Sequence, residues 1–553
     1  MHRISPLLLF AGLVLASPLS AQRDASAQAD LQLDGVYGGT TAELRLHSTE
    51  IGQPAAMAFG AASVTQLSSR DALMLIKPHG ATIFQGIIGP DGTFQVDVPL
   101  AVPAYPGVRF FAQGGVMHRD GFWVGSHRKA LIGEAAGPSF HLEHATSLPG
   151  TVANRPTDDL ATGDIDRDGD LDLILATAMG SQVLINQDGV FTDETDARLP
   201  GGKWIPAMTV AFGDVDLDGD QDLLAGGGID LNGIPLDTYL WFNDGNGNFF
   251  HGIPLLTGMP TSSAAFGDLD GDGLLDLVLT HSHHYLHQVD HPSTILFNRT
   301  VGGQVSFVED AVFAAASFNN ATLTQEVILG DVDRDGDLDI YLAKTGNGGE
   351  VNRLFLNDGA GVFSDASSSN LPAINWGDGD KSSGCAFADV NGDGWLDIVV
   401  ANGYLTIDPA DSADLLINRG ASDPGVFDDA PLNLPDAYDP FLPVRLGVET
   451  GDVDLDGDTD IILTPMEWFG PGPNGTVGIP TLYLNGGGAQ GGTEGIFAKD
   501  WSFLPTTEPF MVHRASLFDA DGDGDLDFYS CGFGSITGSP AGFQDHFFLN
   551  LIP

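Results

Sequence analysis

Cysteine is nearly absent from this sequence of 553 residues, which contains only Cys385 and Cys531. Two cysteines cannot form a disulfide framework, so the fold must be stabilised in another way. Each cysteine lies in a hydrophobic, strand-like stretch, SSGCAFADV or DFYSCGFG, which is typical of a buried thiol. We therefore expect two buried free thiols rather than a disulfide.

Basic residues are also scarce, with 22 Lys plus Arg against 75 Asp plus Glu. Such an excess of negative charge repels the phosphates of nucleic acids and anionic membrane surfaces, so we expect no nucleic-acid partner. The acidic composition does not indicate disorder, because 42% of the residues are hydrophobic and 33 are Phe. The acidic residues must therefore lie in folded structure.

Long hydrophobic runs are missing, and the apolar run from Leu7 to Ala16 is too short to cross a bilayer. It follows His2 and Arg3 and precedes small residues that end at Ala21, which is the pattern of a secretory signal peptide. We expect a signal peptide at 1–21, a flexible leader at 22–30 and no membrane span. The protein is then secreted and extracellular, or else periplasmic or on the cell surface.

One nine-residue pattern that begins and ends with Asp occurs seven times, at intervals of 50 to 67 residues. The seven copies are DIDRDGDLD, DVDLDGDQD, DLDGDGLLD, DVDRDGDLD, DVNGDGWLD, DVDLDGDTD and DADGDGDLD. Repetition at such a period predicts an array of similar structural units.

Each copy is surrounded by four strand-like segments. A small or apolar run such as TVAFGD precedes the copy, and an apolar run such as LDLVLT follows it. A third segment ends in Asn, as in YLWFN and RLFLN, and a fourth is centred on Phe, as in GVFTDETDARLP. Four short strands per unit without a helical period predict an all-β, seven-bladed β-propeller at 138–553.

The last unit lacks a fourth strand, because the chain ends soon after its third strand in HFFLNLIP. The segment PSFHLEHATSLPG, residues 138–150, resembles a fourth strand and precedes the first copy of the pattern. We therefore expect the strand around Phe140 to complete the last blade and close the ring, which removes its open edges. The residues before it, 31–136, contain short strand-like runs between Gly and Pro turns and predict a small β-sandwich.

The nine-residue loops carry the chemistry of a calcium site. Calcium takes six to eight oxygen ligands, and alternate residues on a tight turn can aim their carboxylates at one point. Gly at position 6 supplies the backbone conformation that such a turn requires. Position 7 varies in side chain, as expected where the backbone carbonyl is the ligand. Solvated Asp-Gly turns are the alternative, but four converging carboxylates without a cation repel one another.

The expected ligands, up to seven calcium ions in all, fall into five sets. Position 1 is Asp164, Asp214, Asp268, Asp331, Asp389, Asp452 and Asp519. Position 3 is Asp166, Asp216, Asp270, Asp333, Asn391, Asp454 and Asp521. Position 5 is Asp168, Asp218, Asp272, Asp335, Asp393, Asp456 and Asp523. Position 7, through its carbonyl, is Asp170, Asp220, Leu274, Asp337, Trp395, Asp458 and Asp525. Position 9 is Asp172, Asp222, Asp276, Asp339, Asp397, Asp460 and Asp527.

The seven units resemble the FG-GAP repeats, also called VCBS repeats, of integrin α-chain propellers and of related bacterial exported proteins. A helical calcium loop would need Glu at position 12, where this chain has apolar residues such as Leu175 and Ala225. The resemblance implies calcium held by side chains at positions 1, 3, 5 and 9 and by the carbonyl at position 7. Asn391 departs from the pattern and lowers the ligand charge of the fifth site.

Function is expected in the variable loops, since the resemblance implies a ligand-binding face opposite the calcium loops. The stretch THSHHYLHQVDH is the first candidate, for zinc or a similar metal, although its spacing matches no established zinc motif. Exposed aromatic rings are the second candidate for a ligand-binding site, because such rings stack on sugars or pack on proteins. The alternative is that these rings pack in the core near the central channel. The histidine candidates with their neighbouring carboxylate are His281, His283, His284, His287, Asp290 and His291, and the aromatic candidates are Tyr404, Trp468 and Phe469.

Catalytic signatures are absent: there is no GxSxG, Walker loop, HExxH or catalytic cysteine setting. We therefore expect a monomeric, non-catalytic scaffold for cell adhesion or ligand binding, with an extracellular protein or glycan as partner. The alternative is a polysaccharide lyase, since some propellers with this repeat resemble such enzymes. A lyase needs a cation to neutralise a uronate and a base, and the candidates are Lys381, Arg445, Arg514 and the histidines above.

Overall fold

The structure is a computed structural model of the 553-residue chain. It describes residues 148–149, 157–177, 180–199, 206–228, 234–281, 292–313, 323–345, 351–372, 382–402, 413–430, 433–435, 444–466, 480–487, 493–500, 503, 512–532 and 545–550, together with the backbone of the strands before residue 143. The chain divides into two compact units, residues 1–135 and 136–552. Among the described residues, no helix has the length and apolar character that crossing a membrane requires.

The first unit contains two sheets. One has the strand order β1-β2-β5, and the other has the order β4-β3-β6-β7 with β8 also paired to β6. Their strands are β1 (Ala29–Asp34), β2 (Thr41–Ser48), β3 (Pro54–Ala61), β4 (Thr82–Ile87), β5 (Thr93–Pro99), β6 (Arg109–Met117), β7 (Trp123–Gly125) and β8 (Lys129–Ile132). The small β-sandwich stays a prediction, because the side chains of this unit lie outside the described residues.

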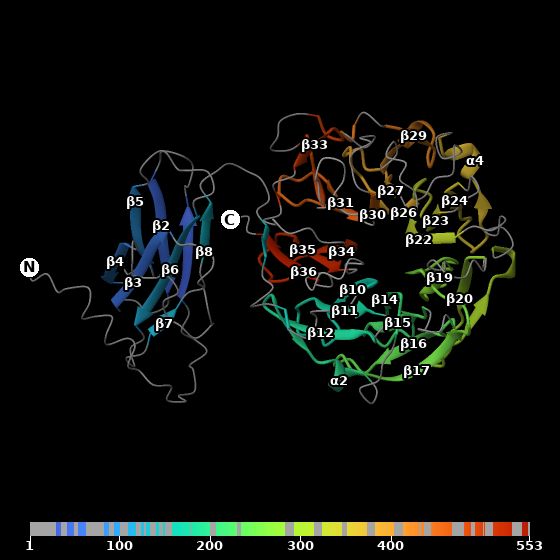
Figure 1. Ribbon diagram of the computed structural model, residues 1–553, viewed down its shortest axis with the longest axis horizontal. Coiled ribbons are helices and arrows are strands. Elements are labelled where there is room, and N and C mark those ends of the chain that lie inside the picture. The colour runs from blue at the N-terminus through green and yellow to red at the C-terminus, as the bar shows by residue number, and fades with distance from the viewer. Residues whose placement is uncertain are drawn as a thin grey trace, which may run out of the picture. The chain divides into compact units, whose positions relative to one another are not determined.

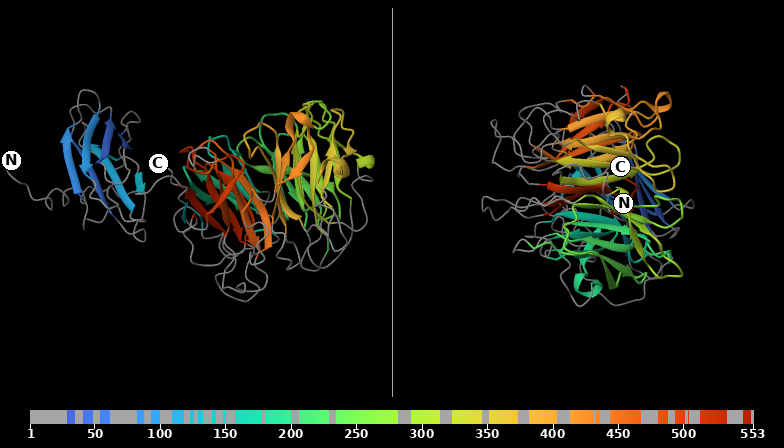
Figure 2. Two further views of the ribbon diagram at one scale, coloured as in Figure 1. Left: turned by 90° about the horizontal axis from the view of Figure 1, so that it is seen from above. Right: turned by 90° about the vertical axis from the view of Figure 1, so that its right-hand side faces the viewer.

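The second unit is a seven-bladed β-propeller of four-stranded antiparallel sheets, as the sequence predicts (Figure 1). The first strands of successive blades, β10, β14, β18, β22, β26, β30 and β34, lie innermost. Each contacts the next, and β34 contacts β10, so the ring is closed. Figure 2 gives two further views of the sheets around this ring.

The blades follow one another along the chain. Blade one contains β10 (Asp159–Gly163), β11 (Asp172–Ala176), β12 (Gln182–Gln187) and β13 (Val190–Asp193). Blade two contains β14 (Thr209–Gly213), β15 (Asp222–Gly226), β16 (Thr238–Asn243) and β17 (Phe249–Leu256). Blade three contains β18 (Ser263–Gly267), β19 (Asp276–Thr280), β20 (Thr294–Asn298) and β21 (Phe307–Glu309). Blade four contains β22 (Leu323–Gly330), β23 (Asp339–Thr345), β24 (Arg353–Leu356) and β25 (Ser364–Asp365).

Blade five contains β26 (Ser382–Ala388), β27 (Asp397–Asn402), β28 (Ala413–Asn418) and β29 (Phe427–Asp429). Blade six contains β30 (Val444–Gly451), β31 (Asp460–Met466), β32 (Thr481–Asn485) and β33 (Phe497–Asp500). Blade seven contains β34 (Val512–Phe518), β35 (Asp527–Gly532), β36 (His546–Asn550) and, from before blade one, β9 (Phe140–Leu142). Phe140 pairs with Asn550, which confirms the predicted closing strand.

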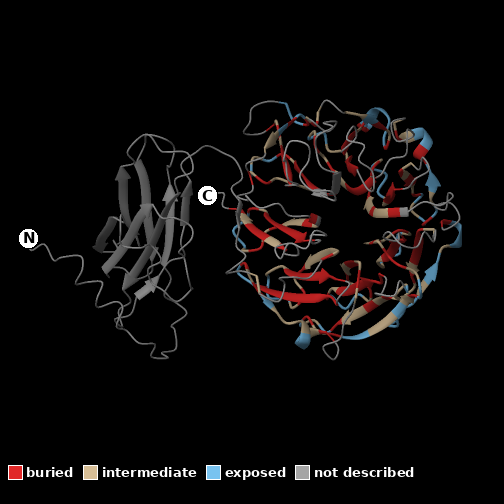
Figure 3. Ribbon diagram, viewed as in Figure 1, coloured by how far each residue is buried: buried red, intermediate tan, exposed pale blue. Residues whose placement is uncertain are grey.

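Burial is greatest in the second strand of a blade, is intermediate in first strands such as β10 and is lowest in outer strands such as β25 (Figure 3). The second strands β11, β15, β19, β23, β27 and β35 are buried along their whole length, because neighbouring blades cover both of their faces. The outer strand β25 is exposed. Short helices, which the sequence analysis did not expect, are α2 (Thr195–Arg198), α4 (Ser367–Asn370) and the 3-10 turn η4 (Gly420–Ser422).

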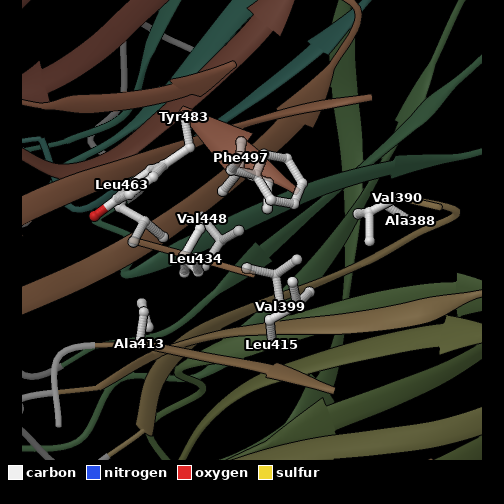
Figure 4. Packing of buried hydrophobic residues seen from close by; sticks show 12 residues of the cluster. Ala388, Val390, Val399, Ala413, Leu415, Leu434, Val448, Leu463, Tyr483 and Phe497 are labelled. Atoms are coloured by element: carbon white, nitrogen blue, oxygen red, sulfur yellow. The ribbon is translucent and has the colours of Figure 1, made fainter. Parts of the chain in front are cut away.

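The hydrophobic core is divided into clusters that lie between adjacent blades. Figure 4 shows one of them, where Val399 and Leu415 of blade five pack with Val448 and Tyr483 of blade six. The glycine that ends a first strand makes room for the next blade, since a Cβ on Gly213 would lie 2.8 Å from the ring of Phe266. Cys385 and Cys531 are buried and free, as predicted.

Candidate metal sites in the aspartate loops

Each nine-residue loop joins the first strand of a blade to the second and is held by its own carboxylates. The position 1 side chain caps the turn: Asp164 accepts hydrogen bonds from the backbone N–H groups of Asp168 and Gly169, at 3.1 and 3.2 Å. The position 5 side chain accepts from the N–H of position 7, as Asp168 does from Asp170 at 3.0 Å. These bonds curl the loop and bring alternate side chains to its inside.

Backbone conformation explains the glycine at position 6. Gly169 and its six counterparts all have positive φ, between 85° and 100°, where an L side chain is strained. Position 4 also has positive φ in every blade, including 62° at Arg167 and 58° at Arg334. The only sign of this second constraint in the sequence is the glycine that three of the seven loops have at position 4.

The position 9 aspartates are the most deeply buried carboxylates of the loops, at 0 or 1% exposure. In blade one, Asp172 accepts the N–H of Ile165 at 3.1 Å and the N–H of Asn186 at 2.8 Å, and the same two bonds occur in all seven blades. Burial raises the pKa of Asp172 to about 7 and of Asp460 to about 8, although these hydrogen bonds oppose the shift. Ionising such a group inside the protein is favourable only if positive charge lies nearby.

Carboxylate oxygens converge within the loops. In blades one, three, four and six, one oxygen each from positions 1, 3 and 9 lies within 4.8 Å of the others, and in blade two the set is Asp214, Asp216 and Asp218. Several of these oxygens are buried without a hydrogen-bond partner, namely Oδ1 of Asp166, Asp270, Asp331 and Asp521. Buried, unpartnered carboxylate oxygens that face one another fit a hard cation with oxygen ligands. The clusters can therefore hold metal ions, as the sequence predicts.

The loops differ in charge. Asn391 replaces the position 3 aspartate in blade five, and its Oδ1 accepts the N–H of Asp393 at 2.9 Å. In blade three, the guanidinium of Arg299 lies 2.5 Å from Asp270 and 3.0 Å from Asp272, so a positive charge already contacts two expected ligands. Blade one has a similar contact, since the guanidinium of Arg198 lies 3.2 Å from Asp166. These three loops should bind a cation less tightly than the others.

The asparagine at the end of the third strand is a site residue that the sequence analysis noticed but did not interpret. In blade six, the side-chain N–H₂ of Asn485 donates to the carbonyls of Val390 at 2.8 Å and of Thr459 at 2.9 Å. Val390 is position 2 of the blade-five loop, so each asparagine joins its own loop to that of the preceding blade. The remaining inter-blade bonds are Asn186 to Ala520, Asn243 to Ile165, Asn298 to Val215, Asn357 to Leu269, Asn418 to Val332 and Asn550 to Val453.

Of the other predicted site residues, the structure describes the side chains of only His281 and Arg514. His281 is buried at 2% exposure, and its ring nitrogens contact the carbonyl of Pro260 and Oγ1 of Thr294, both at 3.1 Å. It is therefore a core histidine rather than a metal ligand. The remaining histidines of that loop, Asp290, Lys381, Tyr404, Trp468, Phe469 and the side chain of Arg445 lie outside the described residues.

Arg514, the described lyase candidate, lies in β34 and forms an ion pair with Glu326 of β22 at 2.6 Å. Glu326 also accepts the backbone N–H of Cys385 at 2.7 Å. Asp159 and Glu449, which come from two further blades, act electrostatically on this pair. Burial raises the pKa of both carboxyls, and the charge of Arg514 opposes the rise. Arg514 is thus already compensated by carboxylates of the chain itself.

Comparison with known proteins supports the assignment of the repeat. Residues 141–225, 231–279 and 331–400 match the model of the FG-GAP-like repeat. No curated protein matches the sequence. Among solved structures, a DUF4784 family protein from Bacteroides caccae is 10% identical, with 74% of this chain and 96% of that chain covered, at a TM-score of 0.23. That score is too low to bear on function. The seven four-stranded blades and the closed ring make the second unit a seven-bladed β-propeller, and three stretches of it match the FG-GAP-like repeat.

Proposed function

We propose that this protein is an exported, calcium-dependent scaffold that binds a protein or glycan outside the cell without catalysing a reaction. The observation that carries the calcium part is the set of buried, unpartnered aspartate oxygens in the loops, Oδ1 of Asp166, Asp270, Asp331 and Asp521. Only oxygen ligands are present, which is the preference of calcium. The signal-peptide pattern at 1–21 supports export.

Calcium would supply the positive charge that the loops lack. The residues that would hold it are positions 1, 3, 5 and 9 with the carbonyl of position 7. Bound calcium would link the first and second strands of each blade and stabilise only the folded state. The expected gain is about 2.7 kcal/mol for each independent site at a free calcium concentration one hundred times its dissociation constant.

The melting temperature tests calcium dependence. We expect it to fall when calcium is removed with EGTA and to recover when calcium is restored, while magnesium at the same concentration restores less. Mg²⁺ demands a stricter octahedral geometry and dehydrates reluctantly. Melting that is unaffected by EGTA, in protein from which metal analysis shows calcium to have been removed, would contradict the proposal.

Ligand binding is tested separately, on arrays of extracellular proteins and uncharged glycans. The scaffold hypothesis expects a signal that is lost with EGTA. The ion pair of Arg514 with Glu326 supports a scaffold rather than a lyase, because this guanidinium is not free to neutralise a uronate. Incubation with polyuronates distinguishes the two, since the appearance of unsaturated products would indicate a lyase acting by β-elimination.

A further inference from the structure

The position 7 aspartates contact the turn that follows the third strand of their own blade. In blade two, a Cβ built on Gly245 would lie 3.1 Å from Oδ2 of Asp220. In blade six the equivalent residue is Gly487, which also follows the third-strand asparagine by two residues. A Cβ built on Gly487 would lie 2.5 Å from Oδ2 of Asp458. The two aspartates are 6% and 5% exposed. The same carboxylate is therefore buried in the same place in both blades.

The two blades differ in what neutralises this carboxylate. In blade two, Arg167 extends from position 4 of the blade-one loop, and its guanidinium lies 3.7 Å from Asp220. In blade six, the preceding loop has Gly392 at position 4 and therefore no side chain to contribute. Neither oxygen of Asp458 has a hydrogen-bond partner, and no described ion pair includes it.

A second carboxylate occupies the place of the missing arginine. Glu494 lies in the turn before β33. Its Cβ and Cγ would lie 3.1 and 3.2 Å from the same Cβ built on Gly487. Its carboxylate fills the space in which a Cβ on Gly392 would lie. Burial comes first among the causes that raise the pKa of Asp458, followed by Asp456 and Asp454 of the same loop and then by charge repulsion from Glu494. Where blade two has opposite charges, blade six has like charges.

We propose that the junction of blades five and six binds an additional divalent cation between Asp458 and Glu494, separate from the loop sites. The converging carboxylates of the blade-six loop are Asp452, Asp454 and Asp460, so Asp458 is not one of them. Carboxylate oxygens favour a hard ion, and calcium is the ion expected. The site shares the calcium chemistry of the proposed function but does not use the converging loop carboxylates.

The number of calcium ions bound per chain tests the site in the full-length protein, by equilibrium dialysis followed by metal analysis. We expect Glu494→Gln to bind one ion fewer than the wild type, and Asp458→Asn to do the same. Glu494 is exposed, so its substitution should leave the fold intact. The matched control is Glu309→Gln, which removes an exposed carboxylate of the outer strand β21, outside the loops, and should leave the ion count unchanged.

A rescue variant separates lost charge balance from general damage. Gly392→Arg combined with Glu494→Ala rebuilds the pair seen between blades one and two, and the left-handed backbone at Gly392, φ 66°, matches that of Arg167, φ 62°. We expect this variant to bind one ion fewer and to melt higher in EGTA than Glu494→Ala alone. Equal ion counts in wild type and Glu494→Gln would overturn the inference while leaving the loop sites intact. A wild type that binds no calcium would overturn both the inference and the proposed function.

Discussion

At the scale of single residues, the position 9 aspartates do two things that can be separated. Asp339 holds the loop together by accepting the backbone N–H groups of Val332 at 3.0 Å and Asn357 at 2.9 Å. It is also a candidate metal ligand. Asp335, at position 5, is exposed and accepts only the N–H of Asp337, at 3.1 Å. The first residue is therefore needed for folding and the second mainly for binding.

The loss of stability on substituting each of these two residues should depend on calcium in a different way. Asp339→Ala leaves two buried N–H groups without an acceptor, so we expect it to lower the free energy of unfolding by about 3 kcal/mol in EGTA and by more in calcium, where a ligand is also lost. Asp335→Asn should destabilise the protein only when calcium is present. Urea denaturation in calcium and in EGTA measures both. A loss of the same size for Asp335→Asn in EGTA would show that its role is structural.

Asp545 gives a pH dependence that does not involve the loops. It is buried beside blade one, where it accepts hydrogen bonds from Thr157 Oγ1, Tyr529 OH and the N–H of Gly532 at 2.7 to 2.9 Å. Burial raises its pKa to about 7, above the 3.8 of an exposed aspartate, although the hydrogen bonds oppose the shift. Between pH 4 and 7 the folded protein keeps a proton that the unfolded chain has released. This contribution to stability is complete below pH 4 and is lost as the pH rises to 7.

Asp545→Asn should remove this loss, because the amide does not titrate. The free energy of unfolding of the variant minus that of the wild type should be about 2 kcal/mol larger at pH 8 than at pH 5. The comparison is made in EGTA, so that calcium binding does not contribute to the difference. A difference between the two proteins that stays constant from pH 5 to pH 8 would show that Asp545 is ionised throughout.

At the scale of elements, the third-strand asparagines connect the blades. Asn418 donates to Val332 of the preceding loop at 2.8 Å and to Leu396 of its own blade at 3.1 Å. Asn418→Ala removes the donor for both carbonyls, so we expect a loss of about 1 to 3 kcal/mol. Hydrogen exchange should accelerate in the loops of blades four and five together.

The control is Asn246→Ala, in an exposed turn, which should change stability by less than about 0.5 kcal/mol. Faster exchange confined to blade five in the Asn418 variant would mean that the blades are independent. Exchange that accelerates in every blade would instead indicate that the propeller opens as one cooperative unit.

The sequence predicted the strands and the closing strand around Phe140, but not the side-chain bonds between blades, for a physical reason. The strands follow from each Asp-Gly loop, because a hairpin turn fixes the strands on both of its sides. The asparagine bonds were not predicted, since Asn485 and Val390 are 95 residues apart and only ring closure brings them together. The candidate loop ligands were predicted because they are local. The contact of Glu494 with Gly392, between two blades, has no local signal.

At the scale of the whole molecule, one ion pair crosses the propeller. Arg514 belongs to blade seven and Glu326 to blade four, which are not neighbours in the ring, so their 2.6 Å contact must span the central region. Both side chains are largely buried, at 14% and 18% exposure, where an ion pair is less screened than at the surface. The pair and the bond from Glu326 to blade five link the two halves of the ring across its axis.

Closure of the ring depends on three residues from the other end of the propeller unit. The strand β9, Phe140–Leu142, pairs with β36 and supplies the fourth strand of blade seven. Deletion of residues 140–142 from the full chain would expose the edge of β36, whose backbone groups could then pair with another chain. We expect a lower melting temperature and concentration-dependent association, measured by differential scanning calorimetry and sedimentation velocity.

The control for this deletion is the removal of residues 301–303, an exposed turn that joins β20 to the outer strand of blade three but takes no part in ring closure. It should leave the protein monomeric, because the inner strands of every blade keep their partners. If the variant without β9 also remains monomeric and melts with the wild type, the outer strand of blade seven contributes little, and the ring is held by its inner contacts. Those include the contact of β10 with β34 and the ion pair across the axis. Adding Glu326→Gln to the deletion would then distinguish them, since a propeller that relies on the axial pair should lose stability only in the combined variant.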